Sequence, residues 1–176
     1  MYNRLYSFLS KHNCIYKLQF GFRQNHSTIH ALIDLTENIR KALDKSEFAV
    51  GIFIDLQKAF DTVDHNILLQ KLNYYGIRGT ANNWFKSYLT NRMQFVSING
   101  YNSDKLITQY GVPQGSVLGP LLFLIYINDL HESIKFCSIR LFVDDKNLLI
   151  ANKSLKKIRK HLNLDLRFIS NQIKSL

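Results

Sequence analysis

The most informative segment of the chain is Leu141-Phe142-Val143-Asp144-Asp145, an apolar strand that ends in two adjacent aspartates. A third aspartate, Asp55, ends another apolar strand. Carboxylates placed together repel one another and resist burial, so such a group favours a cation. Mg²⁺ prefers carboxylate and phosphate oxygens, and two such ions about 3.5–4 Å apart support in-line phosphoryl transfer. The alternative is an ordinary hairpin turn, because Asp is common in turns.

Composition places the chain among globular proteins with a polyanionic partner. Its 176 residues are 46% hydrophobic and include only 2 prolines, which is typical of one domain with a packed core. The net charge of +10 favours nucleic acid ahead of a membrane as partner. The longest apolar stretch, 117–127, is shorter than the roughly 20 residues of a membrane span and predicts a buried helix instead.

The cysteines indicate neither a metal site nor a disulfide framework. Cys14 and Cys137 lie far apart in the sequence, and each has core-like neighbours. We expect both to be reduced and buried, as in an intracellular protein.

Hydrophobic periodicity predicts an α+β fold. Helices are expected over 2–11, 28–43, 64–75, 80–89, 116–130 and 154–175, and strands over 48–56, 93–98, 105–110, 138–143 and 147–151. The strand over 48–56 is expected to be buried, Ser27 or Thr28 and Asp64 to cap helices, and Asn99-Gly100 to form a two-residue hairpin turn. Strands joined in hairpins and separated by helices predict an antiparallel sheet with helices on one face.

A glycine-rich loop, Gly111-Val112-Pro113-Gln114-Gly115, precedes the apolar helix. Glycine allows the backbone to approach a ligand, and a helix that begins at Ser116 would add free N–H donors. The Gln114 amide both donates and accepts hydrogen bonds. The alternative is a structural strand-to-helix turn capped by Ser116.

Three segments together resemble the motifs of a known family. They are Phe53-Ile-Asp-Leu-Gln-Lys-Ala-Phe-Asp-Thr-Val-Asp-His65, Tyr110-Gly-Val-Pro-Gln-Gly-Ser-Val-Leu-Gly-Pro120 and Phe142-Val-Asp-Asp145. They resemble motifs A, B and C of reverse transcriptases, and their wording is closest to non-LTR (LINE-like, jockey-type) retrotransposons. Gln19-Phe-Gly-Phe-Arg23 resembles the fingers segment before motif A. The resemblance implies a polymerase palm over 47–176, a fingers portion over 1–46, and no thumb.

The resemblance also implies site residues. Asp55, Asp144 and Asp145 would be catalytic and would ligate two Mg²⁺ ions, or Mn²⁺ as a substitute. Phe60 would be the steric gate against a ribose 2′-hydroxyl, although outside this motif it would be an ordinary core residue. Asp61 and His65 belong to motif A, where capping of the following helix is the alternative to a chemical role.

Further residues are expected to contact substrates. Those expected to bind the nucleotide are Arg23, Leu56, Gln114 and Gly115, and those expected to bind nucleic acid are Gly111, Pro113, Lys156 and Lys160. Lys156 and Lys160 belong to the basic face of the last helix, for which a solvated surface is the alternative.

Three positions depart from the family pattern. Val143 replaces the usual Ala before the aspartates, and Gln172 stands where a Trp usually follows Ser170-Asn171. Lys146 replaces a small polar residue, and we expect its ammonium to pair with Asp144 or Asp145 and lower metal affinity. Such changes are typical of a decaying element copy.

The leading hypothesis is an RNA-directed DNA polymerase that uses an RNA template, a DNA primer and dNTPs. A group II intron maturase is a related alternative, and the motif A wording speaks against it. A catalytically inactive, retrotransposon-derived nucleic-acid-binding fragment is the alternative of another class. A purely structural α+β domain would have to match three ordered motifs by chance.

Overall fold

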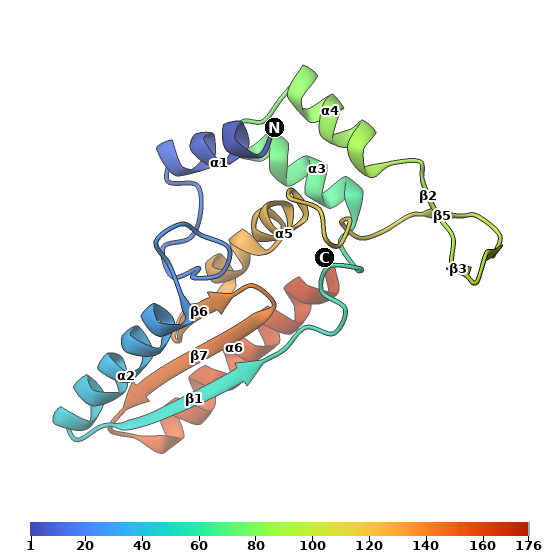
Figure 1. Cartoon of the computed structure of the whole chain (residues 1–176). Coiled ribbons are helices and arrows are strands. Elements are labelled where there is room, and N and C mark those ends of the chain that lie inside the picture. Colours follow the sequence, from blue (N-terminus) through green and yellow to red (C-terminus); the bar gives the residue numbers. More distant parts are fainter. Residues whose placement is uncertain (176) are drawn as a thin grey trace.

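The computed structural model describes residues 1–175 (Figure 1). Its helices are α1 (Tyr2–Lys11), α2 (Thr28–Asp44), α3 (His65–Tyr74), α4 (Thr80–Leu89), α5 (Gly119–Ile127) and α6 (Leu155–Ser175), with the 3₁₀ helix η1 (Asn128–Ser133) directly after α5. Its strands are β1 (Phe48–Ile54), β2 (Arg92–Gln94), β3 (Ser97–Ile98), β4 (Tyr101–Asn102), β5 (Leu106–Thr108), β6 (Ser138–Phe142) and β7 (Asp145–Asn152). The predicted α+β class is confirmed.

The main sheet is antiparallel, in the order β1-β7-β6. Strand β1 pairs with β7 from Phe48↔Asn152 to Ile54↔Lys146. Strand β6 pairs with β7 as far as Phe142↔Asp145, where the hairpin turns. The central strand β7 is the second half of the aspartate hairpin, so this motif lies in the middle of the sheet.

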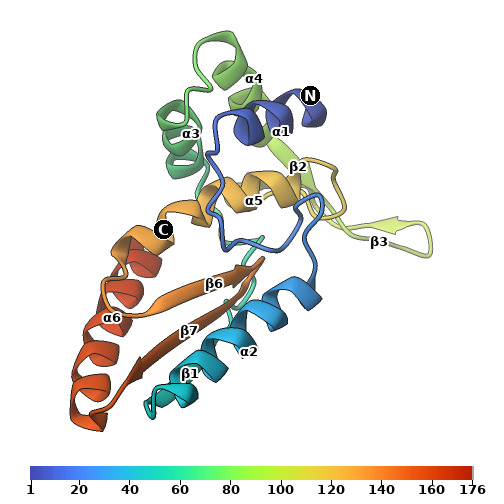
Figure 2. The ribbon, with the colours of Figure 1, turned by 90° about the vertical axis from the view of Figure 1, so that its left-hand side faces the viewer.

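Helices cover both faces of this sheet, contrary to the prediction of one face (Figure 2). On one face Ile139 and Leu148 pack with Ile169 of α6. On the other, Arg140 of β6 forms an ion pair with Asp34 of α2. Hydrophobic periodicity did not reveal how this helix packs, because Ile29 and Ile33 are exposed and Ala42 is the buried residue of α2.

Strand β1 is an edge strand, so the expected burial of 48–56 was wrong. Its residues alternate between exposed and half-buried, and the Phe53 side chain is 76% exposed. An edge strand has a neighbour on one side only, which leaves part of an apolar sequence uncovered.

Helix α5 forms the centre of a second core and confirms the buried helix predicted from the apolar stretch. Residues on every side of α5 are buried, as expected of a helix that is apolar all round. Leu9 of α1, Leu72 of α3 and Phe85 of α4 belong to the same core. These helices form the upper part of the molecule in Figure 1.

Helix α5 begins at Gly119 rather than at the predicted Ser116. The Ser116 hydroxyl donates to the Pro113 carbonyl at 2.7 Å and accepts from the Gly119 N–H at 3.0 Å. Residues 113–116 therefore form a turn before the helix. A Cβ at Gly119 would lie 2.9 Å from the Pro113 oxygen, so this turn lies across the start of α5.

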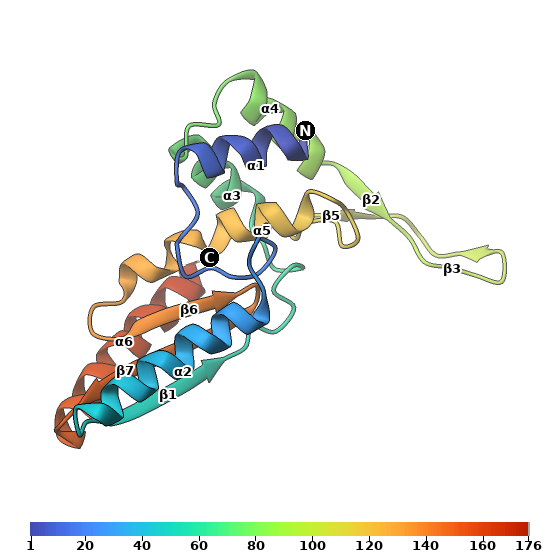
Figure 3. The same cartoon turned by 60° about the vertical axis from the view of Figure 1, so that its left-hand side comes forward.

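The caps predicted for the helices after Ser27 and Asp64, and the turn predicted at Asn99-Gly100, are confirmed. Ser27 accepts from the His30 N–H at the start of α2, and Asp64 accepts from two N–H groups at the start of α3. Asn99 and Gly100 have φ of 50° and 84° and join β3 to β4 in a hairpin that projects from the molecule (Figure 3).

Cys14 and Cys137 are half-buried free thiols, so their predicted burial is only partial. Within residues 1–175, no helix combines the length and apolarity needed to cross a membrane.

Candidate active site

The register of the main sheet brings Asp55 to the aspartate hairpin. Ile54 is the last residue of β1 and pairs with Lys146. Asp55 directly follows Ile54, and Asp145 directly precedes Lys146, so both aspartates lie at this end of the sheet. The structure therefore gathers Asp55, Asp144 and Asp145 at one end of the sheet.

The hairpin turns through only two residues, Val143 and Asp144, between the paired Phe142 and Asp145. Val143 has φ of 59° and is buried. This left-handed conformation is unfavourable for a β-branched residue and costs roughly 1–3 kcal/mol. Asp144 is half-buried, whereas Asp55 and Asp145 are exposed. The carboxylates are thus open to solvent while the backbone beneath them is fixed.

Lys146 places an ammonium among these aspartates. The residue is 1% exposed, and Nζ donates to the Asp144 carbonyl oxygen at 2.7 Å. Burial lowers the pKa of Lys146 to about 8, although Asp144, Asp145 and Asp55 all act to raise it. All three carboxylates therefore influence one cation. The predicted ion pair is wrong in its detail, since the ammonium binds a backbone carbonyl rather than a carboxylate.

The donor set fits Mg²⁺ in its chemistry. Three carboxylates supply the hard oxygen ligands that this ion prefers, and its remaining positions usually go to water and phosphate. Across residues 1–175, no three His, Cys, Asp or Glu side chains are already arranged as a ligand set. The fit therefore rests on the gathering of the aspartates at the end of the sheet.

Phe60 is held by other aromatic rings. Its ring centroid lies 4.6 Å from that of Phe123 in α5 and 6.3 Å from that of Phe22, which it meets edge-on. Phe60 and Leu56 are half-buried against the α5 core. The Phe60 ring is thereby fixed between the central helix and the segment that precedes α2.

The glycine-rich loop is hydrogen-bonded along the segment after β1. The Gly111 N–H donates to the Val63 carbonyl at 2.8 Å, and the Val112 N–H donates to the Phe60 carbonyl at 2.9 Å. Gly111 has φ of 89°, and a Cβ there would lie 3.0 Å from the Cα and the oxygen of Asp61. Glycine is needed at this position for both its conformation and the close approach.

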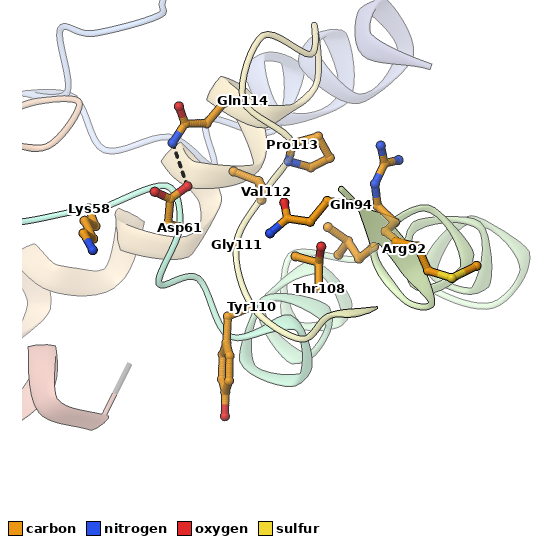
Figure 4. Close-up of a pocket in the computed structure, with 12 residues that line it drawn as sticks. Lys58, Asp61, Arg92, Gln94, Thr108, Tyr110, Gly111, Val112, Pro113 and Gln114 are labelled. Atoms are coloured by element: carbon orange, nitrogen blue, oxygen red, sulfur yellow. Dashed lines mark hydrogen bonds between the residues drawn. The ribbon is translucent and has the colours of Figure 1, made fainter. Parts of the chain in front are cut away.

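Side chains reinforce this contact. Gln114 Nε2 donates to Asp61 Oδ1 at 2.6 Å (Figure 4), and His65 Nε2 bonds the Gly111 carbonyl at 2.7 Å. Asp61 and His65 thus bind the loop, and the capping role considered for them is filled by Asp64. Hydrogen bonds therefore fix the segment that carries motif A to the loop that carries motif B.

A cavity of about 590 Å³ lies between this loop and the strands β2 and β5 (Figure 4). Gly111, Pro113 and Gln114 line it together with the cations Lys58 and Arg92. Asp61 also lines the cavity, so the loop has an open side with two cations and one carboxylate, and Asp55, Asp144 and Asp145 do not belong to it.

Comparison with known proteins identifies the family. Residues 1–174 match the family model described as reverse transcriptase (RNA-dependent DNA polymerase). The chain belongs to the reverse transcriptase family.

Curated relatives of this reverse transcriptase chain come from mobile elements. It is 40% identical over 134 residues to the probable RNA-directed DNA polymerase from transposon BS of Drosophila melanogaster, covering 73% of this chain and 14% of the relative. It is 36% identical over 156 residues to the RNA-directed DNA polymerase from mobile element jockey of the same organism, covering 85% of this chain and 16% of the relative. The chain thus spans about one seventh of these relatives, and they confirm the resemblance to non-LTR retrotransposons.

Solved structures confirm the fold. Telomerase from Candida albicans, solved with a fragment of telomeric RNA, superposes with a TM-score of 0.66 at 14% identity over 91% of this chain and 30% of that chain. Telomerase from Candida tropicalis gives a TM-score of 0.63 at 16% identity over 93% of this chain and 36% of that chain.

The reverse transcriptase chain also contains a contact with the aspartate hairpin that the sequence did not predict. Residues 18–20 lie beside β6, where the Phe20 N–H donates to the Leu141 carbonyl at 2.8 Å and the Leu141 N–H donates to the Leu18 carbonyl at 2.9 Å. The sequence reads here as a loose polar stretch. Its resemblance to the fingers segment assigned a role to Arg23 and none to Gln19.

Arg23 braces the same segment. Its Nη1 donates to the Tyr16 carbonyl at 3.0 Å and to the Gln19 carbonyl at 3.2 Å. In this state the guanidinium is used within the chain, and its expected contact with a nucleotide stays a prediction.

Lys156 and Lys160 lie far from the aspartates. They are exposed on the first turns of α6, which follows the end of β7 remote from Asp145. The eight residues of β7 span roughly 26 Å at about 3.3 Å per residue. A contact of these lysines with nucleic acid would have to occur away from the end of the sheet that carries the aspartates.

Proposed function

We propose that this chain is the catalytic part of an RNA-directed DNA polymerase of a non-LTR retrotransposon, with fingers over 1–46 and palm over 47–176. It would join dNTPs to a primer 3′-hydroxyl on an RNA template. The observation that carries the proposal is the gathering of Asp55, Asp144 and Asp145 at the end of the main sheet, from two separate motifs. The fold does not need three carboxylates at this place for its stability, whereas phosphoryl transfer with two metal ions does need them.

Asp55, Asp144 and Asp145 would hold a pair of Mg²⁺ ions, for which Mn²⁺ can substitute. Bound there, the ions would supply Lewis-acid stabilisation of charge on the phosphate being transferred. The three carboxylates would bind and orient the ions, because Asp55 and Asp145 are exposed and the turn places Asp144 directly before Asp145.

Phe60 would select deoxyribonucleotides. The Phe60 ring packs on Phe123 and Phe22, so its displacement would cost packing energy. An extra 2′-oxygen on the nucleotide would therefore clash with it. Leu56, which packs on the same core, would line the nucleotide site beside it.

Gln114 and Gly115 would contact the nucleotide or the templating base pair. Gly111 and Pro113 would contact the nucleic acid. Both Gln114 and Gly115 are exposed, and Gly115 has φ of 78°. Binding through the Gln114 carboxamide would compete with or extend its bond to Asp61. Arg23 would join this site from the fingers segment.

The net charge of +10 supports nucleic acid as the partner. An RNA–DNA hybrid would be recognised by its A-like shape and backbone rather than by sequence. Affinity should therefore fall steeply with salt, because neutralised phosphates release their counterions.

A second candidate is a nucleic-acid-binding domain without catalysis. Lys146 favours it, because a buried ammonium among the aspartates already supplies part of the positive charge that metal would bring.

Calorimetric titration with Mg²⁺ distinguishes the two. The polymerase proposal expects binding by the natural chain, loss of it in Asp55→Ala, and no change in Asp104→Ala, which alters an exposed aspartate in the projecting hairpin. Equal heats in all three chains would favour the binding domain.

A further inference from the structure

Gln19 is a buried polar side chain that contacts the aspartate hairpin. The residue is 1% exposed, and its Oε1 accepts from the Gly21 N–H at 3.0 Å and from the Val143 N–H at 3.4 Å. Its Nε2 is buried without a hydrogen-bond partner among the residues that the structure describes. An amide is costly to bury in this way, so its acceptor contacts must offset the desolvation.

Gly21 holds Val143 from a second direction. A Cβ on Gly21 would lie 2.4 Å from Val143 Cγ2 and 2.7 Å from the Val143 nitrogen. Only glycine permits this approach, which presses the backbone of the fingers segment directly on the turn. Both contacts are fixed in place because residues 18–20 pair with β6 through Leu141.

Val143, which both contacts hold, has a strained backbone conformation. Val143 has φ of 59°, and such a conformation persists in a β-branched residue only when its surroundings impose it. Its N–H is buried and would otherwise lack an acceptor. Asp144 follows directly, so the direction in which its carboxylate leaves the turn depends on the backbone of Val143.

We propose that Gln19 is a positioning residue, whose Oε1 holds Val143 in the left-handed conformation and so directs Asp144 toward the ions used in nucleotide transfer. The positioning of Asp144 for nucleotide transfer rests on the proposed polymerase function. The contact by which Gln19 holds the turn is a property of the folded chain alone. Gln19 acts through Val143 and touches no substrate.

Two substitutions of Gln19 separate its acceptor from its bulk. Gln19→Met keeps the length of the side chain and removes the acceptor, whereas Gln19→Glu keeps an acceptor oxygen in either protonation state. Gln24→Met is the matched control, because it makes the same chemical change on the same segment at an exposed side chain.

The experiment combines amide hydrogen exchange with Mn²⁺ binding followed by electron paramagnetic resonance. In Gln19→Met we expect exchange at 143–145 to rise about tenfold or more while α5 and β1 keep their natural rates. Gln19→Glu and Gln24→Met should exchange like the natural chain. We expect Mn²⁺ to bind about tenfold more weakly to Gln19→Met than to the Gln24→Met control.

The exchange rates test whether Gln19 holds the turn, and the Mn²⁺ affinities test whether the turn positions Asp144. Unchanged exchange at 143–145 in Gln19→Met, or an equal rise across the whole sheet, would overturn the holding of the turn. Faster exchange there with unchanged Mn²⁺ affinity would overturn the positioning of Asp144. A natural chain that binds no Mn²⁺ would overturn the proposed function itself, and the exchange rates would still decide whether Gln19 holds the turn.

Discussion

Asp165 of α6 stabilises the entry into β6, and its removal should be costly. The carboxylate is fully buried and accepts from the N–H groups of Lys135, Phe136 and Cys137 at 3.1, 2.9 and 2.7 Å. A hydrogen bond to a charged group contributes about 1.5–3 kcal/mol. Three such bonds at the low end give roughly 4.5 kcal/mol, which we expect Asp165→Ala to lose from the free energy of unfolding.

Asp165→Asn should cost about half as much. Oδ2 accepts from both Phe136 and Cys137, a role that the Asn oxygen can keep. The Asn NH₂ group would then face the N–H of Lys135, donor against donor. We expect a loss of roughly 2 kcal/mol.

The stability difference should also depend on pH. Burial acts to raise the pKa of Asp165, but the hydrogen bonds from Cys137, Lys135 and Phe136 together outweigh it and leave the pKa lowered. A lowered folded-state pKa contributes stability above the unfolded value of about 3.9, and this is lost as pH falls through the folded value. The gap between the natural chain and Asp165→Asn should therefore shrink below about pH 4.

Urea unfolding followed by circular dichroism measures these differences, with Asp104→Ala as an exposed control. A loss of less than about 1 kcal/mol in Asp165→Ala would refute the reasoning, because it would mean that water replaces the carboxylate at little cost. A gap that stays constant from pH 7 to pH 3 would refute the pKa argument alone.

Three further predictions concern the site and its supports. Lys146→Met should bind Mg²⁺ about a hundredfold more tightly by calorimetry, because a single and a double positive charge ~10 Å apart repel by about 3.3 kcal/mol at an effective dielectric constant of 20; exposed Lys153→Met should change nothing. Gly111→Ala should lower the free energy of unfolding by about 2 kcal/mol or more, through its positive φ and the 3.0 Å approach to Asp61, and an unchanged urea midpoint would contradict this. Asp34→Ala should cost about 3 kcal/mol in the same assay, since it leaves the buried Arg140 unpaired, and a cost like that of Asp104→Ala would count against it.

The sequence predicted what local signals determine. Asn99-Gly100 turns as expected because both residues tolerate positive φ, and Asp64 caps α3 because its oxygen reaches the first free N–H groups. The run of apolar residues before Asn128 is a buried helix because no side of it can face water.

Long-range packing decided the rest. Helix α2 packs on the sheet with Asp34 paired to Arg140 and with Ala42 buried, while Ile29 and Ile33 stay exposed, which periodicity alone does not reveal. The contacts of Lys146 and Gln19 depend on how a two-residue turn and a distant loop come together. The three aspartates were found from the apolar strands that they end and from the motifs that contain them, whereas the contacts of Gln19 and Lys146 with the turn were not predicted.

Primer extension tests the central claim most directly. The natural chain, Asp144→Asn and the control Asp104→Asn would be given poly(rA)/oligo(dT), dTTP and Mg²⁺ at low salt. We expect extension by the natural chain and the control, and its loss in Asp144→Asn, whose folding is checked by circular dichroism. Equal extension by all three chains would contradict a catalytic role for Asp144, and extension by none would contradict polymerase activity of this chain.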